Sequence, residues 1–496
     1  MQSSDHGLIV HRGNWDAAAK AYLETRMQHW DTVALSGRES AKGLRHAYQR
    51  YLQRKYRFLV PAGSRVLEIG CAEGDLLAAL APNPGVGIDF SAEMINIAKS
   101  KHASLHFFTA DAHRLSVTDL PQELQEPFDV IIISDTVNDV WDVAELMRNI
   151  KNFCSADTRI ICNFLSHLWE HPFQILQKWG LVTPRLPQNW LTLDDMSGIL
   201  SLNGFEVVHT FDEFLWPFAT PFFEPLFNRW AAKLWPFNIF CLTHFIVARL
   251  PMPTRTPLKV SVVIPARNES GNIEAALQRT PDMGAETEII FVEGHSTDDT
   301  WTKILRMAEK YQHKKIQVLQ QTGKGKGDAV RCGFAVAGGD ILMILDADLT
   351  MPPESLPQFY EALASGKAEF ANGVRLVYPQ EKEAMRFCNL IANKFFSMAF
   401  SWLLGRSIKD TLCGTKALSR KHYRQLLAGR GYFGDFDPFG DFDLLFGAAK
   451  VNLQMKDIPI RYRERTYGDT NISRWRHGWL LLKMVCFAAG KIKFVP

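Results

Sequence analysis

The chain has 496 residues, 47% hydrophobic and 22% charged, a composition typical of globular proteins with roughly two to four domains. Its formal net charge of +3 argues against a general nucleic-acid-binding protein, because such proteins carry a strong basic excess. We therefore expect no nucleic-acid partner. The first residues contain no basic stretch followed by an apolar run, so we expect a cytoplasmic protein.

Strand-like apolar runs alternate with helical stretches along the chain, which predicts an α/β fold with parallel sheets. The strand-like runs of the first half are 65–69, 85–89, 129–133 and 159–162, and the second half opens with 260–264. Three prolines between residues 251 and 257 indicate a short, stiff linker. The expected organisation is a domain at 1–250 with a helical cap over about 1–60, a linker at 251–258, and a domain at 259–496.

In the first domain, residues 66–75 read as a strand that enters a glycine-containing turn and then a helix. Small residues in such a turn let the backbone approach a ligand closely. Asp89 ends the next strand, where an acid can bind both hydroxyls of a ribose, although an acid there can also simply cap the following helix. Asp111 follows the third strand and suits an adenine amino group, and Asp135 follows the fourth.

Over about residues 50–210, this set resembles the class I S-adenosylmethionine (SAM) dependent methyltransferases. The resemblance implies a Rossmann-like domain that binds SAM through Glu68, Gly70, Ala72, Gly74, Asp89, Asp111, Ala112 and Asp135. Ala72 stands where many members have glycine, and we expect mild crowding there. The main alternative is a nicotinamide dinucleotide site, but the turn lacks the G-x-G-x-x-G spacing. Methyl transfer mainly needs alignment of the reacting atoms, so no catalytic triad is required.

In the second domain, three apolar runs end in polar turns, at Pro265, at Glu293 and at Asp346-Ala347-Asp348. Two carboxylates at a strand end can hold a divalent cation, which would neutralise a diphosphate leaving group. Lys324 and Lys326, in a glycine-rich loop, can reach the same phosphates. Asp-x-Asp pairs are common by chance, so the position behind a buried strand is what favours a nucleotide-sugar site.

Residues 260 to about 465 resemble the family 2 glycosyltransferases, inverting enzymes of the GT-A fold, and most of all the dolichol-phosphate mannose synthase and polyprenyl-phosphate branch. The residues that carry this second resemblance are Asn389, 403–405, 410–416, Arg465 and Gly468. It implies nucleoside binding by Pro265, Ala266, Asn268, Glu269 and Glu293, and nucleotide and metal binding by Asp346 and Asp348. The implied ligands are a UDP- or GDP-hexose and Mg²⁺ or Mn²⁺. Departures at 293–295 and Lys416 leave the base and the sugar open.

The sugar acceptor can be a hydroxyl or a phosphate. Asp410, Asp441 and Asp443 are candidate general bases for a hydroxyl. A phosphate is already ionised and needs no base, and the candidate ligands for it are Lys416, Arg463, Arg465 and Arg474. Stretches 383–404 and 479–494 are apolar with polar stripes or flanking cations, a pattern that fits either helices on a membrane surface or ordinary core helices. The resemblance favours a polyprenyl-phosphate-like lipid acceptor and a peripheral position on the cytoplasmic face of the inner membrane.

The two patterns together predict a bifunctional enzyme. It would couple SAM-dependent methyl transfer with inverting, metal-dependent transfer of a hexose to a lipid-linked or glycan acceptor. The alternatives are a monofunctional glycosyltransferase with a SAM-binding scaffold domain, glycosylation of a soluble small molecule, and a nucleotide-sugar sensor. Asp346 and Asp348 argue against the sensor, since a binding module has no need of a leaving-group metal.

Overall fold

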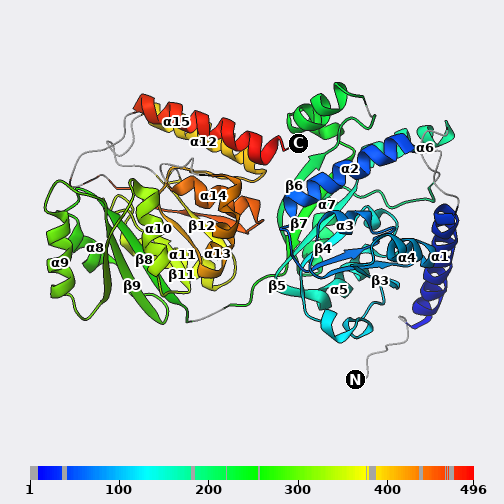
Figure 1. Ribbon diagram of the computed structural model, residues 1–496, viewed down its shortest axis with the longest axis horizontal. Helices are drawn as coiled ribbons and strands as arrows, with labels where there is room; N and C mark the ends of the chain where they lie inside the picture. The colour runs from blue at the N-terminus through cyan, green and yellow to red at the C-terminus, as the bar shows by residue number, and fades with distance from the viewer. Residues whose placement is uncertain are drawn as a thin grey trace, which may run out of the picture. The chain divides into compact units, whose positions relative to one another are not determined.

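The computed structural model describes residues 9–35, 42–179, 185–218, 220–254, 257–375, 377–378, 387–434, 440–463, 465, 467 and 474–495, without the side chains of 9–16, 42–45, 387–391, 441 and 474–477. The chain divides into two compact units, Met1–Pro251 and Met252–Val495, called here the N-terminal and C-terminal units. Each unit contains one seven-stranded sheet (Figure 1). Residues 255 and 256 of the expected linker lie outside the described residues.

The sheet of the N-terminal unit has the strand order β3-β2-β1-β4-β5-β7-β6. Its strands are β1 (Val66–Ile69), β2 (Gly85–Asp89), β3 (His106–Thr109), β4 (Phe128–Ser134), β5 (Cys154–Leu165), β6 (Glu206–Glu213) and β7 (Thr243–Arg249). The first five are parallel, whereas β7 runs antiparallel to both β5 and β6. The α/β fold class is confirmed, with β7 as the one strand of this sheet that runs against the others.

Helices cover both faces of this sheet. The two N-terminal helices are α1 (Ile9–Leu35) and α2 (Lys42–Leu59). One face packs against α2, α3 (Asp75–Ala79) and α4 (Ala92–Lys101), and the other against α5 (Val143–Ile150) and α7 (Leu193–Leu202). Alternate residues of β4 enter the two cores, because successive side chains of a strand point to opposite faces. A sheet buried on both faces explains why its strands read as continuous apolar runs.

The sheet of the C-terminal unit has the order β10-β9-β8-β11-β13-β12-β14. Its strands are β8 (Lys259–Ala266), β9 (Glu286–Glu293), β10 (Lys315–Gln320), β11 (Ile341–Ile344), β12 (Phe370–Val374), β13 (Lys416–Ser419) and β14 (Met455–Pro459). Strand β13 runs antiparallel to β11 and β12, and the other neighbouring pairs are parallel. The carboxyl ends of β9, β8 and β11 therefore meet at one edge.

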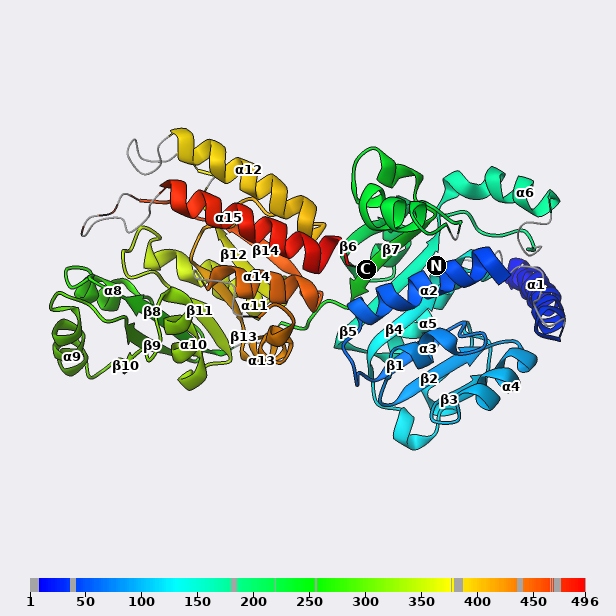
Figure 2. The same cartoon turned by 45° about the horizontal axis from the view of Figure 1, so that its top comes forward.

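Helices also flank both faces of the second sheet. One face carries α8 (Ile273–Arg279), α9 (Thr300–Lys310) and α11 (Leu356–Ala364), and the other carries α10 (Lys326–Val336), α13 (Arg420–Gly429) and α14 (Asp441–Lys450). Two longer helices, α12 (Phe387–Leu404) and α15 (Arg474–Ala488), lie side by side next to this second layer (Figures 1 and 2). Within the described residues, none of the helices has the length and apolarity needed to cross a bilayer.

Candidate functional sites

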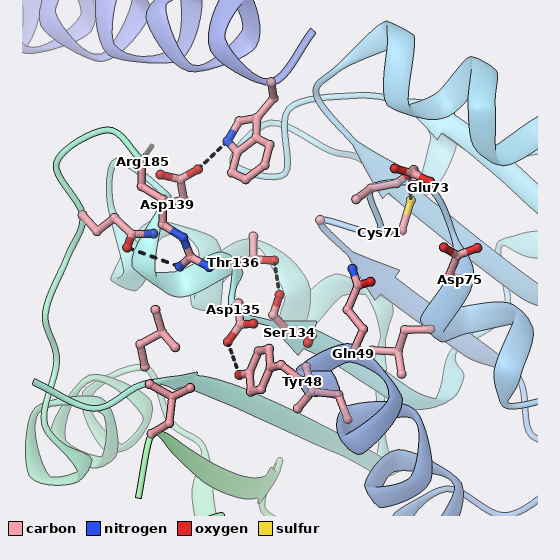
Figure 3. Close-up of a pocket in the computed structure, with 18 of the residues that line it drawn as sticks. Tyr48, Gln49, Cys71, Glu73, Asp75, Ser134, Asp135, Thr136, Asp139 and Arg185 are labelled. Atoms are coloured by element: carbon pink, nitrogen blue, oxygen red, sulfur yellow. Dashed lines mark hydrogen bonds between the residues drawn. The ribbon is translucent and has the colours of Figure 1, made fainter. Parts of the chain in front are cut away.

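A cavity of about 290 Å³ opens beside the carboxyl ends of β1, β2 and β4 in the N-terminal unit (Figure 3). Ligands of open α/β sheets bind at this edge, outside the carboxyl ends of the strands. Of the residues expected to bind SAM, Glu68, Gly70, Ala72, Asp89 and Asp135 line the cavity. Gly74, Asp111 and Ala112 are not part of its lining.

The turn after β1 needs small residues for two separate reasons. Gly70 has φ 74°, and a Cβ atom there would lie 2.2 Å from Oγ1 of Thr136, so no side chain fits. Ala72 has φ 46°, in the left-handed region that favours glycine, which costs an alanine about 1 kcal/mol. The departure at Ala72 therefore strains the backbone, an effect different from the crowding expected from the sequence.

Two buried carboxyl groups lie on the cavity wall. The backbone N–H groups of Ala72 and Ser91 each donate to Asp89 at 2.9 Å. Burial raises the pKa of Asp89, although these two hydrogen bonds oppose the shift. Burial also raises the pKa of Glu68 well above its usual range, and its Oε2 accepts no hydrogen bond from any described residue. An unsatisfied buried oxygen of this kind is stabilised by a donor on a ligand.

Asp111 is engaged outside the cavity. Its carboxylate accepts hydrogen bonds from the backbone N–H of His113, at 3.0 Å, and from the ring Nδ1, at 2.9 Å. Burial acts to raise the pKa of Asp111, but the bonds from His113 outweigh it and lower that pKa. The structure thus gives Asp111 a role in ordering the loop after β3.

Asp135 is the polar centre of the other cavity wall. Its Oδ1 accepts a hydrogen bond from the Tyr48 hydroxyl at 3.0 Å (Figure 3). It also accepts one from Nδ2 of Asn163 at 2.8 Å. Burial raises the pKa of Asp135 to about 6, although the nearby Arg185 opposes the shift. The backbone of Asp135 has φ 56°, a strained conformation that persists mainly at functional positions. This arrangement suits a base that works near neutral pH.

The rest of the cavity wall is largely apolar. The side that faces Asp135 includes Leu52, Leu165, Trp169, Phe173, Leu176, Phe214, Pro217, Phe218 and Leu242, together with the polar Tyr48, Gln49, Arg185 and Gln188. Sequence reasoning found none of these residues, because they come from α2, from the region around α6 (Glu170–Lys178) and from the segment before β7. A hydrophobic compartment next to Asp135 can accommodate the body of an apolar acceptor.

In the C-terminal unit, acidic and basic side chains meet where β11 ends. Oδ1 of Asp346 lies 2.6 Å from Nζ of Lys326, the first residue of α10. Arg465 donates to Oδ2 of Asp348 at 2.7 Å and to Oε1 of Glu269 at 3.2 Å. The structure therefore brings together five of the residues that the sequence pattern selected.

Asn268 connects the turn after β8 to the turn after β9, and Glu293 stabilises the turn after β9. Oδ1 of Asn268 accepts the N–H of Thr297 at 2.8 Å, and Oε1 of Glu293 accepts the N–H of Ser296 at 2.5 Å. Burial opposes ionisation of Glu293, but the bonds from Ser296 outweigh it and lower the pKa. The remaining predicted residues of this edge, Pro265, Ala266 and Lys324, lie at the end of β8 and in the exposed loop before α10.

Gly414 is a site residue that sequence reasoning did not single out. A Cβ atom built on it would lie 2.1 Å from Oδ2 of Asp346 and 2.1 Å from Nζ of Lys326. Its backbone therefore presses directly against this ion pair. The sequence shows a glycine within the 410–416 stretch, but not its neighbours. Only the antiparallel pairing of β11 with β13 explains why this glycine lies against Asp346 and Lys326.

Comparison with known proteins assigns the two units to different families. Residues 44–210 match the family model of a methyltransferase domain, and residues 261–427 match that of glycosyl transferase family 2. The chain joins a methyltransferase domain to a family 2 glycosyltransferase domain.

The curated relatives resemble the glycosyltransferase domain. Dolichol-phosphate mannosyltransferase of Pyrococcus furiosus is 36% identical over 33% of this chain and 47% of its own length. Undecaprenyl-phosphate 4-deoxy-4-formamido-L-arabinose transferase of Klebsiella pneumoniae is 29% identical over 45% of this chain and 66% of its own length. The chain thus spans about half to two thirds of these relatives. A solved structure of magnesium protoporphyrin IX methyltransferase from Synechocystis, with 19% identity and a TM-score of 0.30, covers 42% of this chain and 85% of its own.

Two acceptor-site candidates of the glycosyltransferase domain have structural roles instead. Arg375 donates to Asp410 through Nε at 2.7 Å and through Nη2 at 2.9 Å, and this buried ion pair lowers the pKa of Asp410 against the effect of burial. Lys416 is fully buried and donates to Oδ1 of Asn372 at 2.8 Å. This differs from the expected roles, because both side chains are buried and already paired within the protein.

The other acceptor-site candidates fall into two groups. Asp443 pairs with Arg430 at 3.1 Å, and the exposed Arg463 donates its backbone N–H to the carbonyl oxygen of Thr350 at 2.9 Å. The side chains of Asp441 and Arg474 lie outside the described residues, as do the side chain of Asn389 and all of Gly468.

We expect Asp410→Asn to destabilise the glycosyltransferase domain by about 3–5 kcal/mol, because it leaves the buried Arg375 without a counter-charge. Urea unfolding should show this loss, and Arg375→Met combined with Asp410→Leu should recover much of it. A variant with native stability and abolished hexose transfer would instead support the role as a general base.

Proposed function

We propose that this chain transfers a methyl group from SAM to one acceptor and a hexose from a nucleotide sugar to a lipid-linked acceptor. The observation that carries the proposal is the placement of two separate acid-bearing sites at the carboxyl edges of two sheets, within two matched families. Their fusion in one chain favours consecutive modification of one glycan or glycolipid.

The methyltransferase cavity fits SAM on three observations. Gly70 leaves room that a Cβ would fill, Asp89 ends β2 beside the turn, and Glu68 has an oxygen without a donor among the described residues. Asp89 would hold the ribose hydroxyls, and Glu68 would receive a donor from the ligand. Bound SAM supplies an electrophilic methyl group, and Asp135 accepts the proton that an acceptor hydroxyl loses.

Asp89→Ala is expected to weaken SAM binding by roughly 1–3 kcal/mol, because buried ribose hydroxyls lose their acceptor. Titration calorimetry of the full chain measures this directly. Asp129→Ala removes an exposed acid from the opposite end of β4 and is the matched control, with unchanged affinity expected. Wild-type protein that binds no SAM contradicts the proposal, whereas SAM binding without methyl transfer to any acceptor supports a scaffold domain.

The glycosyltransferase site fits a divalent cation shared with a diphosphate. Within the described part of the chain, no three His, Cys, Asp or Glu side chains gather as a metal site. Mg²⁺ commonly takes one or two carboxylates and completes its shell with water and substrate phosphate, which suits Asp346 and Asp348. When bound, the ion neutralises charge on the leaving diphosphate. Lys326 would add a cation to the same phosphates.

A phosphate is the acceptor that this site favours. Asp410, one of the candidate bases, is buried against Arg375, which lowers its pKa and makes it a weak proton acceptor. An already ionised phosphate needs no base. Arg463 and Arg465 follow β14 and would bind the acceptor phosphate through charge-assisted hydrogen bonds. The relatives named for polyprenyl phosphates support the lipid-linked form of this acceptor.

Helices α12 and α15 support action at a membrane surface. Phe396, Phe400 and Met484 are buried in the core, so the inner sides of both helices are ordinary packing surfaces. Their outer sides expose Phe395, at 52%, and Trp479, at 61%, with the exposed Lys394 and Lys483 beside them. The inner sides fit the interpretation as core helices, and the exposed aromatic and basic side chains of the outer sides support a membrane-surface role.

Replacing Phe395 and Trp479 together by serine is expected to reduce co-sedimentation with anionic vesicles roughly tenfold, because two exposed aromatic rings no longer enter lipid. Leu305→Ser changes an exposed leucine on α9, across the sheet, and serves as the control with unchanged binding. Wild-type protein that remains in the supernatant would favour a soluble acceptor.

A further inference from the structure

The aromatic-rich segment 215–241 lies between β6 and β7, and contacts among its described residues, 215–218 and 220–241, hold it in shape. It contains three short helical turns, η7 (Pro225–Trp230), η8 (Ala231–Lys233) and η9 (Phe237–Phe240). Trp216 stacks on Phe227 with ring centroids 5.2 Å apart. The Asn228 side chain accepts the N–H of Trp216 at 2.7 Å and donates to its carbonyl oxygen at 2.9 Å. These inner contacts determine which side chains point outward.

The outward side chains are large and apolar. Phe222 and Trp235 are 85% and 81% exposed. The other exposed members of the segment are Phe218, Phe223, Leu226, Trp230, Leu234, Phe237, Ile239 and Phe240, and around α6 they are Leu168, Ile175 and Trp179. Nε1 of Trp169 donates to the carbonyl oxygen of Phe240 at 3.0 Å, which joins the two groups, and both lie on the same side of the N-terminal unit (Figures 1 and 2). We call these exposed side chains the aromatic surface.

Two of the three charged side chains of segment 215–241 are paired within the domain. Glu224 pairs with Arg54 at 3.6 Å, and Lys233 is buried against Glu213. The Arg229 guanidinium lies over the Trp230 ring, 5.6 Å from its centroid, in a cation–π contact. On α6, Lys178 is exposed beside Trp179, so the aromatic surface has few charges and many aromatic rings. A patch dominated by Trp and Phe side chains is typical of a lipid–water interface, and large exposed apolar patches mark interaction sites.

The aromatic surface borders the methyltransferase cavity. Phe218 is 41% exposed and also lines the cavity. Pro217 beside it lines the cavity as well. Around α6, Trp169, Phe173 and Leu176 line the cavity next to the exposed Leu168 and Ile175. Apolar groups therefore lead from the protein surface to the cavity wall that also contains Asp135.

We propose that the aromatic surface docks the methyltransferase domain on a lipid bilayer and that the methyl acceptor is an amphipathic lipid drawn into the cavity. An apolar chain would lie along the aromatic wall with its polar end at Asp135. The docking surface stands on its own observations, whereas the identity of the acceptor rests on the proposed methyltransferase function. Docking through neutral aromatic groups also differs from attraction of cations to anionic lipid, so it should persist on uncharged vesicles.

The test is hydrogen–deuterium exchange of the full chain with and without vesicles of phosphatidylcholine alone. Peptides covering 215–241 and 168–179 should exchange about fivefold more slowly with vesicles, since the bilayer shields them. Phe222→Ser combined with Trp235→Ser should abolish this protection and leave α12 and α15 unaffected. Leu202→Ser, which alters an 89% exposed leucine of the same domain, should retain it.

Two outcomes would overturn the proposal. One is unchanged exchange of 215–241 at vesicle concentrations that sediment the protein. The other is protection that grows with protein concentration in the absence of vesicles, which would identify the aromatic surface as an interface between copies of the chain. SAM titration of the same preparations separates the two proposals, because the serine variant should bind SAM normally. If the wild type binds no SAM, the proposed methyltransferase function is wrong, but the exchange result still tests docking on the bilayer.

Discussion

Replacing Asp348 by alanine is expected to reduce hexose transfer at least about a hundredfold, because a metal that neutralises the leaving diphosphate supplies several kcal/mol. Asp348 lies after β11, where its carboxylate contacts Arg465 and Thr350 and contributes little to the core. The fold should therefore survive. Transfer or hydrolysis of a panel of UDP- and GDP-hexoses measures the effect, and it also identifies the donor.

The strand itself offers a matched control for this variant. Asp340 precedes β11 at the opposite edge of the sheet, where it accepts the N–H of Lys259 at 3.1 Å. Asp340→Ala should leave transfer unchanged. Removing divalent cations with excess chelator should reproduce the loss seen for Asp348→Ala, and Mg²⁺ or Mn²⁺ should restore activity only to the wild type. Full activity in chelator would exclude the metal role of Asp346 and Asp348.

The strands that carry these acids could be predicted from the sequence. Buried parallel strands such as β1, β4, β8 and β11 read as short apolar runs, and the polar residue that ends each one is visible as a break in the pattern. Strand direction was not visible. Strand β7 contains an apolar run like its neighbours, and β13 is only four residues long. Only tertiary pairing shows that both run antiparallel to the strands beside them.

Partners distant in sequence explain why two residues were given roles that differ from their contacts and why another was missed. Asp410 looks like an available acid until its ion pair with Arg375 is known, and Lys416 looks like a phosphate ligand until it is found buried against Asn372. Tyr48 lies 87 positions from Asp135, on a helix before the motifs quoted from the sequence, yet it donates to that carboxylate. Local patterns therefore located the strand ends correctly but did not show which acids were already paired.

Asp135→Asn is expected to reduce methyl transfer about 10²–10⁴-fold for any acceptor that the wild type methylates, the usual contribution of a general base. The wild-type rate should fall as pH drops through about 6, where Asp135 becomes protonated and can no longer accept a proton. The variant should lose this inflection. SAM affinity should change little, because Asp89 and Glu68 remain, and a parallel loss of SAM affinity would instead make Asp135 a ligand of the cofactor.

The stability of the same variant tests the pKa of Asp135 without any acceptor. A carboxyl group whose pKa rises from 3.8 to about 6 on folding costs the native state roughly 3 kcal/mol when it is ionised. Between these values the native protein binds more protons than the unfolded chain, so this group makes stability fall as pH rises. Asparagine carries no such cost. Asp135→Asn should therefore be more stable than the wild type near neutral pH, and the difference should shrink as pH falls from about 6 to about 4, where both forms are uncharged. Urea unfolding across this range measures the difference, and one that does not vary with pH would show that Asp135 is not a base with a raised pKa.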